Sequence, residues 1–220
     1  MSRSIICLLS CAAALCAAPA LAGPLATEPN AYFDGFATWS GNTPFQGYDL
    51  SNNPTDLTGS VDWVVFAPGV FQTLGYSGYT PTPGEYVYAY QADETGNAPL
   101  SSLSVSLQTL ADNFGSFTGN GVFGPTPSAA YFFPSPPSAN WDFHPNGING
   151  TTSGLVFSSP YGPQLLDGST IDHGSVALVL PLPSPLEPNI PEPGTLTLAA
   201  CGIAVLASLR LHRRFRGQHN

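Results

Sequence analysis

The middle of the chain alternates apolar and polar residues in short runs that are broken by glycine and proline. From Ser102 to Gln108, Leu103, Val105 and Leu107 are separated by serines. Because successive side chains of a strand point to opposite faces, this pattern predicts a half-buried antiparallel strand with one apolar face and one serine face. The body shows no comparable run with a helical period, so we expect it to be all-β.

Other short runs between turn residues also have the composition of strands. Val61–Phe66 and Gly174–Leu180 are more continuously apolar, which is typical of central strands. Tyr86–Tyr90 follows a turn signal, and Ala130–Phe133 and Gly154–Ser158 are weaker candidates. About seven short strands without an internal repeat predict an antiparallel β-sandwich of two sheets, of jelly-roll or immunoglobulin-like type. A partly open barrel is the alternative.

Positive charge is confined to the two ends of the chain. There is no lysine, and the 5 basic residues are Arg3 and four arginines after residue 209. Of the 14 acidic residues, all except Glu192 lie between Gly23 and Ile190. Such a body would repel phosphate groups, which excludes nucleic-acid binding and phosphate sites that need a lysine or arginine. The 4 cysteines also lie in the terminal segments, so we expect no disulfide in the body.

The N-terminal end has the three parts of a secretory signal peptide. Arg3 precedes an apolar run over Ile5–Ala18, and a cleavage box follows with small residues at Ala20 and Ala22. The pattern predicts that residues 1–22 are a cleavable signal peptide and that the mature chain begins at Gly23.

The C-terminal end also has three parts in a fixed order. The motif Pro191, Glu192, Pro193 and Gly194 comes first, then an uncharged run over 195–209, then the arginines Arg210, Arg213, Arg214 and Arg216. This order resembles the PEP-CTERM sorting signal of bacterial exported proteins. The resemblance covers 191–216 only. It implies that a membrane-embedded exosortase recognises the tripeptide and processes the protein at the cell surface.

The physical properties of this segment agree with an export signal. A helix over 195–209 would rise about 22 Å, most of a ~30 Å hydrocarbon core, so a short transmembrane helix is expected. The arginines would keep the tail in the cytoplasm and the body outside the cell. Between residues 181 and 193 there are six prolines, which predict an extended stalk.

These observations divide the chain into four parts. Residues 1–22 are the signal peptide, 23–180 the β-rich extracytoplasmic domain, 181–190 a proline-rich linker, and 191–216 the sorting signal. Alternatives remain for both ends. The first segment could be a spanning helix or carry a lipid on Cys11 or Cys16, and the last could be a plain single-pass anchor.

Two groups of side chains are candidate metal ligands. The first group, with oxygen ligands suited to calcium in an irregular loop, is Asp49, Ser51, Asn53 and Asp56. The second group, which would need two loops to meet, is Asp142, His144, Asp172 and His173. The alternative for the second group is a strand end with Trp141 and Phe143 inward and Asp142 and His144 in water. Calcium is the ion that the acidic composition favours most, and no cofactor is otherwise expected.

Signals for catalysis are weak. The run Gly75–Tyr79 lacks the glycine spacing of a serine nucleophile elbow, and Glu85, Asp93 and Glu94 have no predictable position across a cleft. Trp39, Trp63, Trp141 and the tyrosines could stack on sugar rings while Asn and Asp side chains bind hydroxyls, although a core position is the simpler interpretation for most of these rings. We therefore expect a non-catalytic surface or matrix protein. Its expected partners are an exosortase, the membrane through the C-terminal helix, and extracellular polysaccharide. The first alternative is a carbohydrate- or calcium-binding module, and the second is a polysaccharide-acting enzyme.

Overall fold

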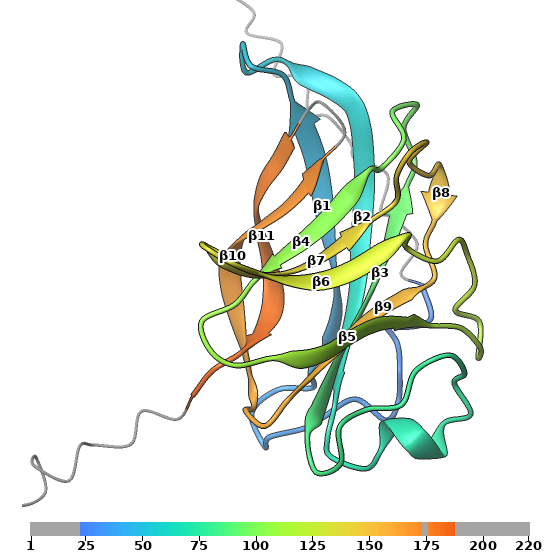
Figure 1. Cartoon of the computed structure of the whole chain (residues 1–220), viewed down its shortest axis with the longest axis vertical. Helices are drawn as coiled ribbons and strands as arrows, with labels where there is room; N and C mark the ends of the chain where they lie inside the picture. Colours follow the sequence, from blue (N-terminus) through green and yellow to red (C-terminus); the bar gives the residue numbers. More distant parts are fainter. Residues whose placement is uncertain (1–22, 173–175, 188–220) are drawn as a thin grey trace, which may run out of the picture. The chain divides into compact units, whose positions relative to one another are not determined.

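The computed structural model describes residues 23–172 and 176–187, and these residues form an antiparallel all-β fold (Figure 1). The strands are β1 (Ser40–Tyr48), β2 (Pro54–Phe66), β3 (Tyr86–Glu94), β4 (Ser102–Ser106), β5 (Asp112–Phe117), β6 (Ala129–Pro134), β7 (Pro137–Asp142), β8 (Gly150–Thr151), β9 (Gly154–Ser159), β10 (Pro163–Asp172) and β11 (Val176–Pro185). A single 3-10 turn, η1 (Phe71–Thr73), follows β2 in this part of the chain. The predicted all-β class is confirmed.

Hydrogen bonds join these strands into one sheet of 11 strands, whereas the pattern predicted two sheets. The order is β5-β9-β3-β2-β1-β11-β10-β4-β7-β6, and β8 pairs with β3. The sheet curls until its two edge strands meet, and Phe114 of β5 stacks on Phe132 of β6 with ring centres 6.3 Å apart. The arrangement is therefore closer to the partly open alternative than to two separate sheets.

The main core lies inside the curl, where β4 and β7 cross over β2 and β3 (Figure 1). At its centre, Trp141 of β7 packs against Tyr90 and Phe157, with ring centres 5.9 Å and 6.3 Å away. The Trp141 indole N–H donates to the carbonyl of Gly115 over 2.9 Å, so the buried ring leaves no donor unpaired.

A second apolar cluster covers the outer face of β2, β3 and β9. It contains Val64, Val87 and Val156 from the sheet, with Leu25 and Phe71 from the segments that cover them. Strand β3 is buried on both faces, so its alternate residues pack into the main core and into the second apolar cluster. This explains why β3 is a nearly continuous run of aromatic and aliphatic residues.

The strand predictions fall on real strands, and one boundary needs correction. In β4, Leu103 and Val105 are buried and the serines face outward, as the alternation predicted. The linker predicted from residue 181 was wrong at its start, because β11 runs to Pro185 and pairs with β10. The prolines of β11 stand at every second position, and the N–H groups of every second residue point to the same edge of a strand. The prolines therefore remove donors from one edge only, and the other edge can still pair.

The remaining predictions for the chain ends lie outside the described residues. These are the signal peptide at 1–22, the linker from 188, and the sorting signal at 191–216 with its helix at 195–209. Within residues 23–172 and 176–187, no helix has the length and apolar character needed to cross a membrane.

Candidate functional site

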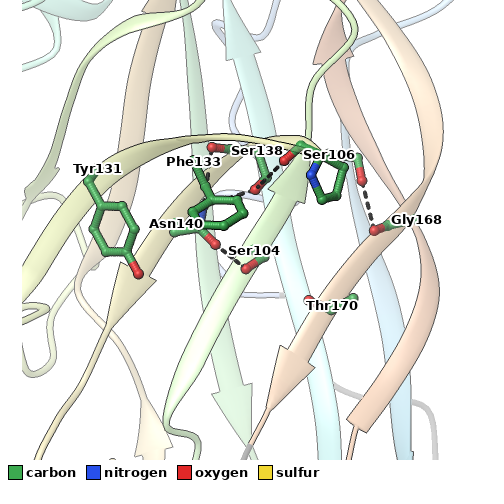
Figure 2. A pocket seen from close by; sticks show the side chains of 9 residues that line it. Ser104, Ser106, Tyr131, Phe133, Ser138, Asn140, Gly168 and Thr170 are labelled. Carbon is green, nitrogen blue, oxygen red and sulfur yellow. Dashed lines mark hydrogen bonds between the residues drawn. The ribbon is translucent and has the colours of Figure 1, made fainter.

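A groove of about 340 Å³ lies on the outer face of β4, β6, β7 and β10. Its lining, shown in Figure 2, consists of Ser104, Ser106, Tyr131, Phe133, Pro136, Ser138, Asn140, Gly168 and Thr170. The polar character follows from the alternation in β4, which directs Leu103 and Val105 inward and leaves a row of serines outside. The groove therefore combines hydroxyl, amide and aromatic groups, and none of its lining side chains carries a charge.

Hydrogen bonds between the strands fix the polar floor of the groove (Figure 2). The Ser104 hydroxyl donates to Asn140 Oδ1. The Asn140 amide in turn donates to Ser138 Oγ over 2.9 Å and to the Ser138 carbonyl over 3.2 Å. Ser106 Oγ donates to the carbonyl of Gly168 over 2.7 Å. Because a hydroxyl oxygen has two lone pairs, these groups keep acceptor capacity for a ligand after their own bonds are made.

Two aromatic rings form one wall of the groove. Tyr131 and Phe133 are 41% and 48% exposed, and they lie two residues apart on β6, so they point to the same face. The Tyr131 hydroxyl donates to Asp142 Oδ2 over 3.0 Å. Partial burial and the bond to this carboxylate raise the pKa of Tyr131, so the hydroxyl stays protonated at neutral pH. Phe132 points the other way and packs on Phe114.

Carboxylates lie beside one end of the groove. Ser102 of β4 is in register with Asp142 of β7 on one side and with Asp172 of β10 on the other. Strands lie ~4.8 Å apart, so the backbones at these two aspartates are about 10 Å apart. The described body contains no lysine or arginine, so the surroundings of the groove are acidic.

The register thus brings together two of the four residues in the second metal hypothesis. His144 is exposed beyond the end of β7, and His173 lies outside the described residues. Trp141 and Phe143 are buried, which confirms the inward and outward alternation of this segment. In the described part of the chain, no three His, Cys, Asp or Glu side chains are placed to share a metal ion.

The first metal hypothesis falls on the turn between β1 and β2. Asp49 Oδ1 accepts the backbone N–H groups of Ser51 and Asn53, each over 2.8 Å, and Oδ2 accepts the Asn53 amide over 3.1 Å. The bonds from Asn53 and Ser51 hold the pKa of Asp49 below its usual value. Asp56 is in β2, past the turn. The carboxylate of Asp49 thus forms the turn, and calcium binding there stays a prediction.

The three carboxylates considered for glycoside hydrolysis do not face each other. Asp93 and Glu94 are consecutive in β3 and point to opposite faces. The Asp93 side chain accepts the Thr151 hydroxyl over 2.7 Å, while Glu94 is buried without a well-aligned hydrogen bond to either oxygen, although the backbone N–H groups of Gly96 and Gly150 lie near it. Burial, and then the neighbouring carboxylate of Asp112, raise the pKa of Glu85. The described residues therefore do not support this catalytic pair.

The tryptophans considered for sugar stacking serve other purposes. Trp141 is in the core, and Trp63 and Trp39 are partly buried with their indole N–H groups bonded to Thr43 Oγ1 and Asp34 Oδ2. Sequence reasoning counted the tyrosines as candidate rings without singling out Tyr131, and it missed Phe133. The sequence held a signal for this site. Tyr131 and Phe133 are two residues apart, so they share a face of their strand, and Ser102–Gln108 presents a row of serines that could lie beside them. Ser77, in the run tested as a nucleophile elbow, bonds to Thr118.

A second pocket of about 510 Å³ opens where the sheet edges β5 and β6 meet. It is lined by residues 108–114 with Phe132 and Pro137, and it is more apolar than the groove. Its rings are already stacked on each other, and it offers fewer fixed polar groups. The groove in Figure 2 is therefore the better candidate for recognition.

No protein-family model, curated protein or solved structure matches this chain.

Proposed function

We propose that the protein is an exported, non-catalytic surface or matrix protein whose C-terminal signal is sorted and cut by an exosortase-type enzyme. The support is the distribution of charge and apolar segments along the chain. All arginines lie in the terminal segments, while the β-rich body is acidic throughout. This is the arrangement expected if the ends contact the membrane and the body faces water.

We further propose that the body binds a neutral carbohydrate in the groove on β4, β6, β7 and β10. The single observation that carries this proposal is the lining, with two exposed rings beside a row of fixed hydroxyl and amide groups. A sugar presents an apolar ring face and several hydroxyls, so both kinds of group match it. Neutral sugars are favoured because Asp142 and Asp172 lie nearby and no described cation could hold an acidic sugar.

The fold class is part of this proposal. Two parts of the curled sheet face each other across the main core. This supports grouping the body with sandwich-type folds of jelly-roll or immunoglobulin-like form, with one continuous hydrogen-bonded sheet supplying both of the facing layers.

A glycan array and calorimetry on the protein purified from an exporting host test the carbohydrate proposal. Tyr131→Ala and Phe133→Ala should each weaken binding of a neutral oligosaccharide by about tenfold. Phe36→Ala is the matched control, because Phe36 is 98% exposed and lies outside the groove. Equal binding by all three variants, or a preference for uronic acids, would argue against this site.

The sorting proposal has a separate test. Mass spectrometry of the mature protein from the native host should show a C-terminus near Pro191–Pro193. Glu192→Ala should leave uncut protein in the membrane. A mature chain that still contains Arg216 would contradict exosortase processing and would support the plain anchor.

A further inference from the structure

Asp62 is a buried carboxylate in a body without lysine or arginine. It lies in the middle of β2, on the face covered by the second apolar cluster, and is only 6% exposed. Its Oδ1 accepts the side-chain amide of Asn42 over 2.6 Å. Its register neighbours are Asn42 on β1 and Gln91 on β3, and the nearest charged group with an effect on it is another carboxylate, Asp93. A buried carboxylate with these neighbours lacks a cation to balance its charge.

The residue that contacts this carboxylate from outside the sheet is Gly23. Its backbone N–H lies close enough to the Asp62 carboxylate to lower the pKa of that group. A β-carbon on Gly23 would lie 2.1 Å from Asp62 Oδ2, so a larger residue at this position would have to displace the carboxylate. Gly23 is also the first residue after the cleavage box that the sequence predicts.

Packing of the following residues holds Gly23 in place. Leu25 is fully buried in the second apolar cluster, and Pro24 lies against Gly121. Glu28 Oε2 accepts the hydroxyl of Tyr76 over 2.9 Å. The contacts of Pro24, Leu25 and Glu28 therefore hold Gly23 beside the sheet whether or not its backbone nitrogen is charged.

We infer that cleavage between Ala22 and Gly23 completes the fold, because the new α-ammonium group of Gly23 becomes the cationic partner of the buried Asp62 carboxylate. The inference rests on the proposed export of the protein. Cleavage consumes one water molecule, which breaks the amide bond. The carboxylate leaves with Ala22, and the released amine of Gly23 takes up a proton.

The chemistry of the new group explains the gain. Before cleavage, Gly23 offers one neutral N–H to Asp62. After cleavage it offers an ammonium with an ordinary pKa of about 7.7–8.0, charged at neutral pH and able to donate three hydrogen bonds. Charge-assisted bonds are roughly twice as strong as neutral ones. The mature chain should therefore be more stable than a chain that continues upstream of Gly23.

Four versions of the chain from Gly23 to Asn220, kept in the same mild detergent, test the inference. Two have Asp62 and two carry Asp62→Asn, and one of each pair is acetylated on the amine of Gly23. The acetyl group reproduces the neutral amide of the precursor. With Asp62 present, acetylation should lower the melting temperature by about 5 °C. In the Asp62→Asn pair it should change the melting temperature by much less.

Asp93→Asn is the matched control, and acetylation should still destabilise that variant. NMR titration of the Gly23 amine gives a second readout that needs no variant, and its pKa should lie above the ordinary range. Equal effects of acetylation with and without Asp62, or an amine that titrates at its ordinary pKa, would overturn the ion pair. N-terminal sequencing of the protein from the exporting host tests the cleavage position itself. A start other than Gly23 would refute the proposed processing, whatever the recombinant chains show.

Discussion

The two outer faces of the curled sheet differ in what covers them. Over β4 and β7, the outward residues are serine and asparagine, and the face stays open as a groove. Over β2 and β3, the outward residues include Val64, Phe66 and Val87, and the N-terminal segment and η1 cover them. The comparison shows that the outward-facing residues of each strand decide how that face is used. Where they are polar, the face stays open to solvent, and where they are apolar, another segment of the chain covers it.

The faces also differ in how they treat carboxylates. Asp142, beside the groove, accepts a hydrogen bond from Tyr131 and remains in contact with water. Asp62, under the covered face, is removed from water and has its pKa raised, first by burial and then by Asp93. Since the described body has no basic residue apart from histidine, the cost of burying an acid here is offset by neutral donors such as the Asn42 amide, by an amine, or by protonation.

The largest effect is expected from removing a ring on the covered face. Phe71→Ala should destabilise the protein by about 3–5 kcal/mol, because the ring is buried and packs against Phe66, Tyr76 and Phe117. Urea unfolding followed by fluorescence measures the change. Phe133→Ala in the groove should cost well under half as much. Similar losses at the two positions would remove the distinction between a covered and an open face.

The next effect concerns a buried carboxylate at the end of β3. Burial raises the pKa of Glu94 above its ordinary value. The folded state therefore holds the proton more tightly, and stability should fall as pH rises from about 4.3 through the raised pKa, then level off. Glu94→Gln should flatten this pH dependence and stabilise the protein at pH 7 by about 1 kcal/mol. The measurement is a series of unfolding midpoints between pH 4 and pH 8.

Asp142→Asn is the matched change beside the groove. It should not stabilise the protein at pH 7, because this carboxylate keeps contact with water and accepts the Tyr131 hydroxyl. If Glu94→Gln had a lower unfolding midpoint than the wild type at pH 7, the charged form of Glu94 would be the one that stabilises the fold, which would contradict this prediction.

A smaller effect on binding is expected from the floor of the groove. Asn140→Ala removes the amide that links Ser104 and Ser138, and it should weaken neutral oligosaccharide binding by about five- to tenfold. Calorimetry measures the change. Asn97→Ala is the control, because Asn97 is exposed and lies outside the groove. Unchanged affinity in Asn140→Ala would place the ligand elsewhere on the surface.

The smallest effect is expected at the turn between β1 and β2. Asp49→Ala removes the acceptor for the N–H groups of Ser51 and Asn53, so the melting temperature should drop slightly. Because these bonds lower the pKa of Asp49, their contribution should be present above about pH 4 and be lost as pH falls through the lowered value. A melt with millimolar calcium tests the metal hypothesis at the same turn. If calcium raises the melting temperature of the wild type but not that of Asp49→Ala, a calcium site at this turn would be established.

Much of the fold could be predicted because its signal is local. The alternation in Ser102–Gln108 placed β4 and its buried residues, and the prediction for Trp141 and Phe143 was correct for the same reason. The weaker strands β1, β5, β8 and β10 and most of β7 were missed, because glycine, proline and polar residues interrupt their patterns. Their conformation is fixed by pairing with distant strands, which local propensity does not report.

The site was harder to predict because it is assembled from separated segments. Ser104, Tyr131 and Asn140 meet only because β7 lies between β4 and β6. The sequence offered the tryptophans and the tyrosines alike as candidates for sugar binding, and only the fold separates them. The tryptophans were placed in or near the core because large rings are the most effective residues for filling it.

By itself, the sequence determined the all-β class, the acidic body without internal cations, and the apolar ends, since each of these depends on composition or on neighbours along the chain. The tertiary structure decided which polar row became a groove, which carboxylates were buried, and that Gly23 meets Asp62. These outcomes depend on strand order and register, which bring residues far apart in the chain to within hydrogen-bond distance. A one-residue change of register would move every one of those side chains to the opposite face.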